Sequence, residues 1–179
     1  GREREAVEAA EQARRLAPSS PQPYLLLGQI YAARKDMAKA QEMYARALEV
    51  APQLTSTRVA LGYLYDLEGK PAAAIQEYDA VLQTDPRNKR ALSAKVSTLV
   101  RDKKLDQAIA FLQQAVASDP KNVSARVFLG NTYLLNREPK KAEDEYRRAL
   151  KLDERDVTAR LQLARLNFQE SRFGGVLDF

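Results

Sequence analysis

Four prolines of this chain, Pro18, Pro52, Pro86 and Pro120, stand at intervals of 34 residues, and each closes a run of helix-forming residues. Proline has no backbone N–H and disfavours a helical conformation in the residue before it, so it ends a helix. The next position of the series holds Glu154 in place of proline. An interval that recurs over most of the chain predicts a fold built from one repeated unit, in which each unit packs on its neighbours.

Small and aromatic residues keep the same interval. The repeated positions are Gly28, Gly62 and Gly130; Tyr31, Tyr65 and Tyr133; Ala40, Ala74, Ala108 and Ala142; and Tyr44, Tyr78 and Tyr146. Residues 89–122 depart from the pattern, with Val96 at the glycine position and Leu99 and Leu112 at the two tyrosine positions. We expect the small residues to let two helices approach closely and the aromatic residues to fill the space beside them.

Each period contains two amphipathic segments, whose apolar residues recur at spacings of three and four. In the first period these segments are 22–34 and 37–50, and short breakers at 34–36, 68–70 and 136–138 separate the two segments of a period. A helix pair of this kind buries its apolar side only against stacked neighbours.

The pattern as a whole resembles the tetratricopeptide repeat. The first copy carries it as Tyr24, Leu27-Gly28, Tyr31, Ala40, Tyr44, Ala47 and Pro52. The second copy has Arg58 at the first large aromatic position, and the third copy has Lys95-Val96 in place of Leu-Gly. The resemblance implies an all-α fold: a right-handed α-solenoid of antiparallel helix pairs, with about ten helices.

The register divides the chain as follows. We expect the second helix of an incomplete repeat in 1–20, four repeats in 21–54, 55–88, 89–122 (degenerate) and 123–156, and the first helix of a fifth repeat plus the start of its second helix in 157–179.

Both ends of the sequence fall inside a repeat. In the N-terminal helix, 2–17, the small positions are expected at Ala6, Ala10 and Ala13. In the C-terminal stretch SRFGGVLDF, Ser171-Arg172 is expected at the turn between helices, followed by the apolar residues Phe173, Val176, Leu177 and Phe179. This favours a segment of a longer array over a natural end with a worn repeat. It also predicts self-association through exposed terminal repeats, or fraying of the C-terminal residues.

In the family that the sequence resembles, the first helices of the repeats line a concave groove that holds a protein or peptide ligand. Residues that face this groove recur at spacings of three and four along each first helix. The predicted partner-binding residues are Leu25, Gln29, Val59, Tyr63, Asp66, Leu67, Arg90, Ser97, Arg101, Phe128, Asn131, Leu135, Arg165 and Phe168.

Several groove positions have a second interpretation. Leu26, Val127 and Leu134 face the groove or pack between repeats, and Asn131 binds a peptide backbone or is a solvated helix residue. One subfamily binds the C-terminal carboxylate of chaperones through a set of cationic and amide side chains, but at the corresponding positions only Arg90 fits. That kind of ligand is therefore disfavoured.

Two other residues stand out. Lys95 occupies a register position held elsewhere by buried leucines, so we expect it to extend to the surface or to find a carboxylate. Asn122-Val123-Ser124 matches a glycosylation acceptor, a pattern that is frequent by chance.

Composition excludes several chemistries. The chain has no Cys and no His, which removes thiol and imidazole catalysis and the usual zinc ligands. We therefore predict no enzyme activity, no metal and no cofactor. No apolar run is long enough to span a membrane. The net charge of +5 is spread along the chain and few cations fall in the groove, which disfavours nucleic-acid binding.

The function expected is that of a protein–protein interaction scaffold within a larger bacterial assembly or export machine, such as one for polysaccharide export, in the bacterial periplasm or cytoplasm. Family analogy supports this pathway and the two compartments. Two alternatives stay open: a structural spacer or regulatory arm of a larger enzyme or secretion protein, and a nucleic-acid binder acting through the basic surface.

Overall fold

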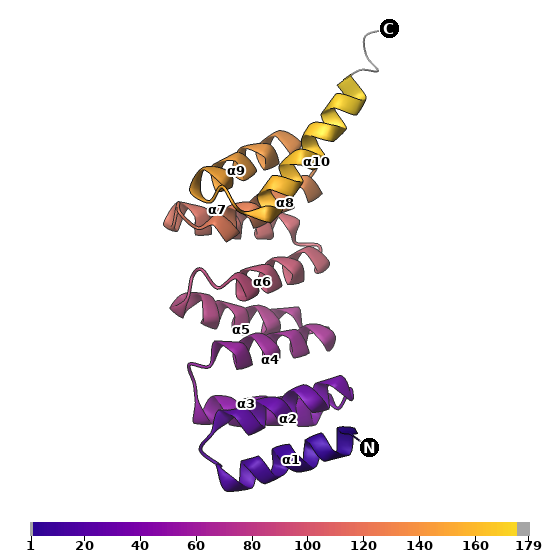
Figure 1. The fold of residues 1–179 in the computed structure, drawn as a ribbon, viewed down its shortest axis with the longest axis vertical. Helices are drawn as coiled ribbons and strands as arrows, with labels where there is room; N and C mark the ends of the chain where they lie inside the picture. Colours follow the sequence, from indigo (N-terminus) through magenta and orange to yellow (C-terminus); the bar gives the residue numbers. More distant parts are fainter. Residues whose placement is uncertain (1, 175–179) are drawn as a thin grey trace. The chain divides into compact units, whose positions relative to one another are not determined.

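The computed structural model describes residues 2–174, with side chains described for 4–168. The described residues form ten α-helices and no strand (Figure 1). The helices are α1 (Arg2–Leu16), α2 (Pro21–Ala33), α3 (Met37–Val50), α4 (Thr55–Leu67), α5 (Pro71–Thr84), α6 (Lys89–Arg101), α7 (Leu105–Ser118), α8 (Val123–Leu135), α9 (Pro139–Leu152) and α10 (Val157–Gly174).

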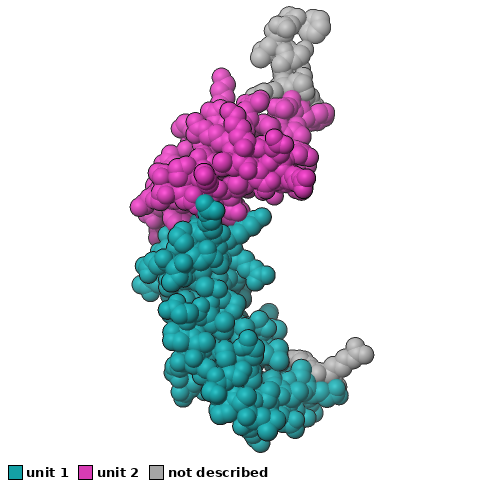
Figure 2. Space-filling model, turned by 60° about the vertical axis from the view of Figure 1, so that its left-hand side comes forward, with its two compact units in different colours: residues 1–98 teal, residues 99–179 magenta. Residues whose placement is uncertain are grey.

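The helices fall into two compact units, unit 1 (Gly1–Thr98) and unit 2 (Leu99–Phe179), and the division in the chain falls within the residue range of α6 (Figure 2). In unit 1, α2 packs on α3 and α4 on α5, while α1 covers α2 and α3 covers α4. In unit 2, α8 packs on α9, with α7 against α8 and α10 against α9. Each unit is a stack of antiparallel helices, the arrangement of an α-solenoid. We call α2, α4, α6, α8 and α10 the first helices, and α1, α3, α5, α7 and α9 the second helices.

Close approach within a helix pair depends on a glycine that faces a tyrosine. A Cβ atom added to Gly28 would lie 2.4 Å from Cε1 of Tyr44, and one added to Gly130 would lie 2.5 Å from Cε1 of Tyr146. Both tyrosines are buried, and Tyr44 packs with Ala40 and with residues of α4. The glycine and tyrosine positions of the repeat are therefore one packing feature.

The turn inside each helix pair has a left-handed residue at the same register position. Lys35, Gly69, Lys103 and Arg137 have φ angles of 61°, 71°, 59° and 58°. In each turn the following residue donates its backbone N–H to a carbonyl five residues earlier, over 2.8 to 2.9 Å. This left-handed ending satisfies helix carbonyls that lack a partner within the helix.

The side chain at the first large aromatic position ties its helix to the preceding loop. The hydroxyl of Tyr24 donates to the carbonyl of Pro18, over 3.2 Å. Arg126 does the same with two guanidinium nitrogens to the carbonyl of Pro120, at 3.0 and 2.8 Å. Arg126 therefore replaces the aromatic residue without loss of this bond.

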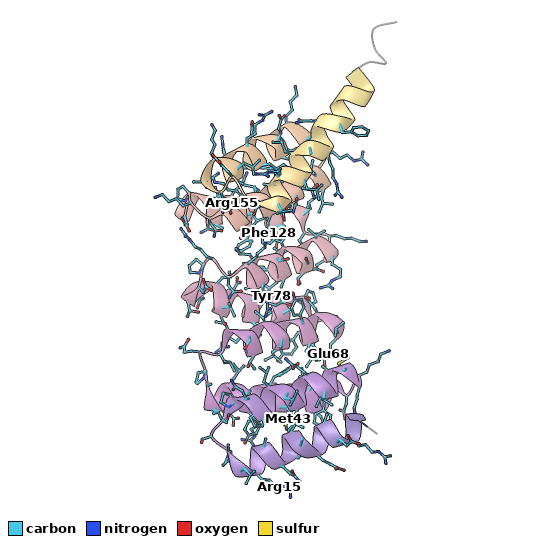
Figure 3. The ribbon with its side chains drawn as sticks, in the orientation of Figure 1. Arg15, Met43, Glu68, Tyr78, Phe128 and Arg155 are labelled. Atoms are coloured by element: carbon cyan, nitrogen blue, oxygen red, sulfur yellow. The ribbon has the colours of Figure 1, made fainter. Side chains whose placement is uncertain are left out.

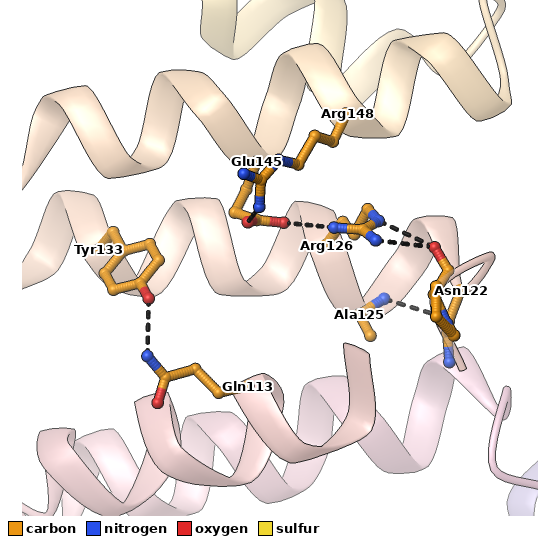
Figure 4. A network of polar contacts seen from close by, with 8 residues as sticks. Gln113, Asn122, Ala125, Arg126, Tyr133, Glu145 and Arg148 are labelled. Atoms are coloured by element: carbon orange, nitrogen blue, oxygen red, sulfur yellow. Dashed lines mark hydrogen bonds and ion pairs between the residues drawn. The ribbon is translucent and has the colours of Figure 1, made fainter. Parts of the chain in front are cut away.

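Arg58 and Arg126, which stand at that position, are each accompanied by a glutamate of the next helix. Nη1 of Arg126 lies 2.9 Å from Oε2 of Glu145, and the two side chains are 11% and 8% exposed (Figure 4). Arg148 donates to the other carboxylate oxygen, over 2.8 Å. Arg58 pairs in the same way with Glu77, at 3.1 Å. The departure from the family pattern at these positions is thus a paired substitution.

Lys95 reaches a carboxylate, as one of the two expectations had it. Its Nζ lies 2.6 Å from Oδ1 of Asp79 on α5, and the side chains are 14% and 41% exposed. The ammonium group is thus paired at the partly solvated edge of the core, where the desolvation cost is smaller than in the interior.

Asn122 is a helix-capping residue in this fold. Its side chain is buried and accepts the N–H of Ala125 at the start of α8, over 3.0 Å. An N-cap residue of this type satisfies one of the free N–H groups of the first helical turn.

The C-terminal prediction is wrong in one respect. Ser171 and Arg172, expected at a turn, lie within α10, which continues to Gly174. The sequence has no glycine or proline between Val157 and Gly174, so no helix-breaking residue ends α10 earlier. The side chain of Phe173 and the whole of Val176, Leu177 and Phe179 lie outside the described residues. At the other end, Ala10 is buried while Ala6 and Ala13 are exposed.

Candidate partner-binding surface

Large apolar side chains that remain exposed gather on the first helices. Seven of the ten in the described part of the chain lie there: Leu26, Tyr63, Leu67, Leu135, Val157, Leu161 and Phe168. The other three, Leu16, Val50 and Leu152, are each the last residue of a second helix. Exposure on the second helices is therefore an effect of helix ends, whereas on the first helices it also occurs along their length.

In unit 1 the exposed apolar residues of the first helices lie on α2 and α4, which contact each other. Tyr63 is 48% exposed and Leu67 69% exposed on α4, and Leu26 is 46% exposed on α2. Gln29, also exposed, is the predicted polar residue on α2. These four side chains form what we call the unit 1 surface.

The ring of Tyr63 rests against a fixed neighbour. It meets the ring of Tyr78 edge to face, with 5.9 Å between centroids and 67° between planes. Tyr78, a residue of α5 that is labelled in Figure 3, is buried in a core cluster with Val59 of α4 and Ala91 of α6. Such an edge-to-face pair orients the exposed ring while leaving its outer face open.

Asp66 is predicted as a groove residue, but its contacts lie inside the unit. Its Oδ2 accepts the hydroxyl of Tyr78 at 3.0 Å and the hydroxyl of Thr98 at 2.7 Å. Burial raises the pKa of Tyr78, and the negative charge and hydrogen bond of Asp66 raise it further. Asp66 therefore holds the tyrosine that supports Tyr63, and is a positioning residue.

Val59 is wrongly predicted as a groove residue. It is 6% exposed and belongs to a core cluster with Ala74, Tyr78 and Val81. Leu25 is half-buried and packs against the neighbouring cluster around Tyr44. The cause is the width of the buried stripe, because a first helix packs against helices on two sides and the stripe covers more of its circumference than a spacing rule allows.

Unit 2 has its own version of this surface on α8 and α10. Leu135 is 60% exposed, Phe168 is 67% exposed, and Arg165 is also exposed. Phe128 is half-buried. Asn131 accepts the hydroxyl of Tyr146 at 2.7 Å, and burial raises the pKa of that tyrosine. Asn131 thus supports the fold in the way that Asp66 does in unit 1.

The remaining predicted residues lie on α6. Arg90 and Ser97 are exposed in unit 1, and Arg101 is exposed in unit 2.

Three positions had two interpretations, exposure in the groove or packing between repeats. Val127 is buried and Leu134 is half-buried, which fits packing between repeats, while Leu26 is exposed. Leu26, Val157 and Leu161 are the exposed apolar residues of the first helices that the predicted set lacks. Leu161 shares its register position with Val59 and Val127, which are both buried, so exposure at this position differs from one repeat to another.

Two kinds of site are absent from the described residues. No group of three or more acidic residues within this part of the chain is placed to hold a metal ion. Within the same part, no helix has the length and apolar character needed to cross a bilayer.

Stacked antiparallel pairs with apolar residues exposed along their first helices define the class of helical-repeat interaction scaffolds. Two sequence models of the tetratricopeptide repeat match the chain, one over residues 1–61 and 99–153 and the other over 59–123. The chain belongs to the tetratricopeptide repeat family. Its members typically bind proteins or peptides and do no chemistry. No curated protein matches the chain in sequence.

Solved structures of similar fold agree with this assignment. YrrB, described as a TPR protein with an unusual peptide-binding site, is 19% identical, with 88% of this chain and 81% of that chain covered and a TM-score of 0.55. The pilF protein of Pseudomonas aeruginosa is 26% identical, with 86% and 70% covered and a TM-score of 0.59. MamA from Desulfovibrio magneticus RS-1 is 20% identical, with 88% and 89% covered and a TM-score of 0.60.

Proposed function

We propose that unit 1 binds a segment of another protein across α2 and α4, with Tyr63 and Leu67 as its main anchors. The observation that carries this proposal concerns where the exposed apolar side chains lie. In the described residues the second helices expose large apolar side chains at their last residues alone, whereas α4 exposes Tyr63 one turn before its end in addition to Leu67 at its last residue. A scaffold that bound nothing on its first helices would gain from polar residues there.

The chemistry of the unit 1 surface favours a peptide with apolar anchors. Tyrosine is enriched among residues that dominate binding energy, because it combines a large apolar area with few rotamers to fix. Complete burial of a leucine side chain contributes about 2 kcal/mol. Gln29 offers both a donor and an acceptor to the backbone of a bound segment.

The assembly that this binding serves is, in our proposal, a bacterial envelope or export machine. The similarity to pilF of Pseudomonas aeruginosa supports a bacterial source, and the peptide-binding site of YrrB supports a peptide ligand. A nucleic-acid ligand fits less well, because the unit 1 surface has no cation among its four residues.

Affinity capture from a lysate of the cells that make the protein tests this proposal. The variant Tyr63→Ser with Leu67→Ser is compared with a matched control, Leu16→Ser with Val50→Ser, which removes two exposed apolar side chains from second helices of the same unit. We expect a protein that the unchanged chain and the control retain and that the first variant loses. Equal retention by all three would overturn the proposal, and the absence of any retained protein would favour a structural spacer.

A further inference from the structure

The left-handed turn positions hold cations where the backbone favours glycine. Three of the four such residues in the described chain are Lys35, Lys103 and Arg137, and only Gly69 is a glycine. A side chain in the left-handed region costs about 1 kcal/mol or more, and Asn or Asp tolerates it better than Lys or Arg. All three cationic side chains are exposed, so no packing inside the fold accounts for them.

In unit 2 two of these turns lie at the same edge. Helix α7 leads away from the turn at 102–104 and α8, packed against it, leads back to the turn at 136–138. We call residues 101–106 and 136–141 the turn edge. The opposite edge carries the loops at 118–123 and 152–157, which we call the loop edge.

The two edges differ in charge. The turn edge has six cations and three carboxylates, whereas the loop edge has two cations and four carboxylates. Within the turn edge, Lys104 pairs with Asp102 at 2.7 Å, and Lys141 pairs with Glu138. No ion pair within the described residues involves Lys103, Arg137 or Lys140. The carboxylates of this edge are thus largely engaged, and cationic groups remain for another molecule.

We propose that the turn edge of unit 2 binds an acidic segment of a partner protein, separately from the groove. Lys103, Arg137 and Lys140 provide the charge, and their unfavourable backbone positions are retained for that contact. The turn edge has no exposed aromatic residue on which a base would stack, which disfavours single-stranded nucleic acid. It also lacks the exposed apolar residues with which a membrane-binding surface inserts.

The test uses the 179-residue chain and a fluorescein-labelled oligoglutamate peptide, with binding followed by anisotropy at low salt. The variant Lys103→Gly with Arg137→Gly removes two charges while giving each turn the residue that its backbone favours. We expect thermal stability to stay equal or rise, and affinity to fall about tenfold, as the loss of two exposed ion pairs implies.

The control variant Lys121→Ala with Arg155→Ala removes the same charge from the loop edge, and we expect it to keep most of the affinity. Equal loss in both variants would show a response to net charge alone and would overturn the proposal, as would unchanged affinity of the glycine variant. If the glycine variant loses stability, Lys103→Gln with Arg137→Gln must show the same loss of binding. The variant Tyr63→Ser with Leu67→Ser must bind the oligoglutamate peptide with unchanged affinity. This result would show that the turn edge binds independently of the unit 1 surface.

Discussion

The ring of Tyr78 occupies the space in which a side chain at Gly62 would begin, because an added Cβ atom would lie 2.4 Å from its Cε1. The same relationship recurs between Gly28 and Tyr44. In residues 89–122 both register positions change together, to Val96 and Leu112. A leucine lacks the extended ring, so the pair of changes is consistent with one packing constraint.

This constraint predicts coupling between the two positions. Gly28→Ala is expected to lower the free energy of unfolding by about 1 to 3 kcal/mol, because the ring of Tyr44 must move. In a background with Tyr44→Leu, the same change is expected to cost less than half as much. Urea unfolding of the four members of this double-mutant cycle measures the coupling. Strictly additive effects would show that the two residues pack independently.

The buried ion pair of α8 and α9 gives a second prediction. Arg126→Leu leaves Glu145 buried with only Arg148 to balance it, and is expected to cost about 3 kcal/mol. Adding Glu145→Met is expected to recover most of that loss, because repeat 1 has Tyr24 and Met43 at these positions. Failure of the double variant to recover stability in urea unfolding would mean that the ion pair itself stabilises the fold.

The two buried threonines of unit 1 should respond oppositely to valine. Thr57 has a buried hydroxyl without a partner, so Thr57→Val is expected to stabilise by about 1 kcal/mol. Thr98 donates to Asp66 and to the carbonyl of Ala94, so Thr98→Val is expected to destabilise by about the same amount. Thermal unfolding of both variants compares them, and a loss of stability with Thr57→Val would contradict the assignment.

The left-handed turn residues predict that exchanging glycine and lysine has opposite effects on stability in the first two repeats. Gly69→Lys is expected to cost about 1 kcal/mol, because φ is 71° and no neighbour lies near enough to compensate. Lys35→Gly is expected to stabilise by several tenths of a kcal/mol or more, although glycine also loses more entropy on folding. Urea midpoints give both values. Destabilisation by Lys35→Gly would show that its side chain stabilises the turn.

Alkaline pH should unfold the chain through its buried tyrosines. Burial raises the pKa of Tyr44, Tyr78 and Tyr146 in the folded state, whereas in the unfolded chain they ionise near pH 10. The folded state therefore holds more protons above that pH. The contribution of these tyrosines to stability is fully present below about pH 10 and is lost as the pH rises further. Urea unfolding between pH 8 and about 11 measures this slope. Tyr44→Phe is expected to reduce it, and an unchanged slope would exclude that residue as a contributor.

The sequence is sufficient to predict the helix pairs because their signals are local and repeated. Proline marks the helix ends, and the recurring glycine, Ala40 and Tyr44 positions mark the faces that pack. The groove was predicted less well, because a spacing rule does not show how wide the buried stripe is. Val59 is buried for that reason, while Leu26, given two interpretations, is exposed.

Polar positions show a further limit of sequence reasoning. Asp66 and Asn131 both hold tyrosine hydroxyls, yet they stand at different register positions, three residues apart. No periodic signal connects them, because the same requirement, a partner for a buried hydroxyl, is met from different places on the helix.

The central claim is that partners bind along the first helices, and site-specific photo-crosslinking tests it most directly. A photoreactive amino acid is placed at Leu67 on α4, and in a control at exposed Gln76 on second helix α5. Cells that make the protein are irradiated, and crosslinked species are identified by mass spectrometry. We predict a defined partner crosslinked from position 67, lost when Tyr63→Ser is added, and absent from position 76. A partner crosslinked from position 76 and not from 67 would contradict the claim.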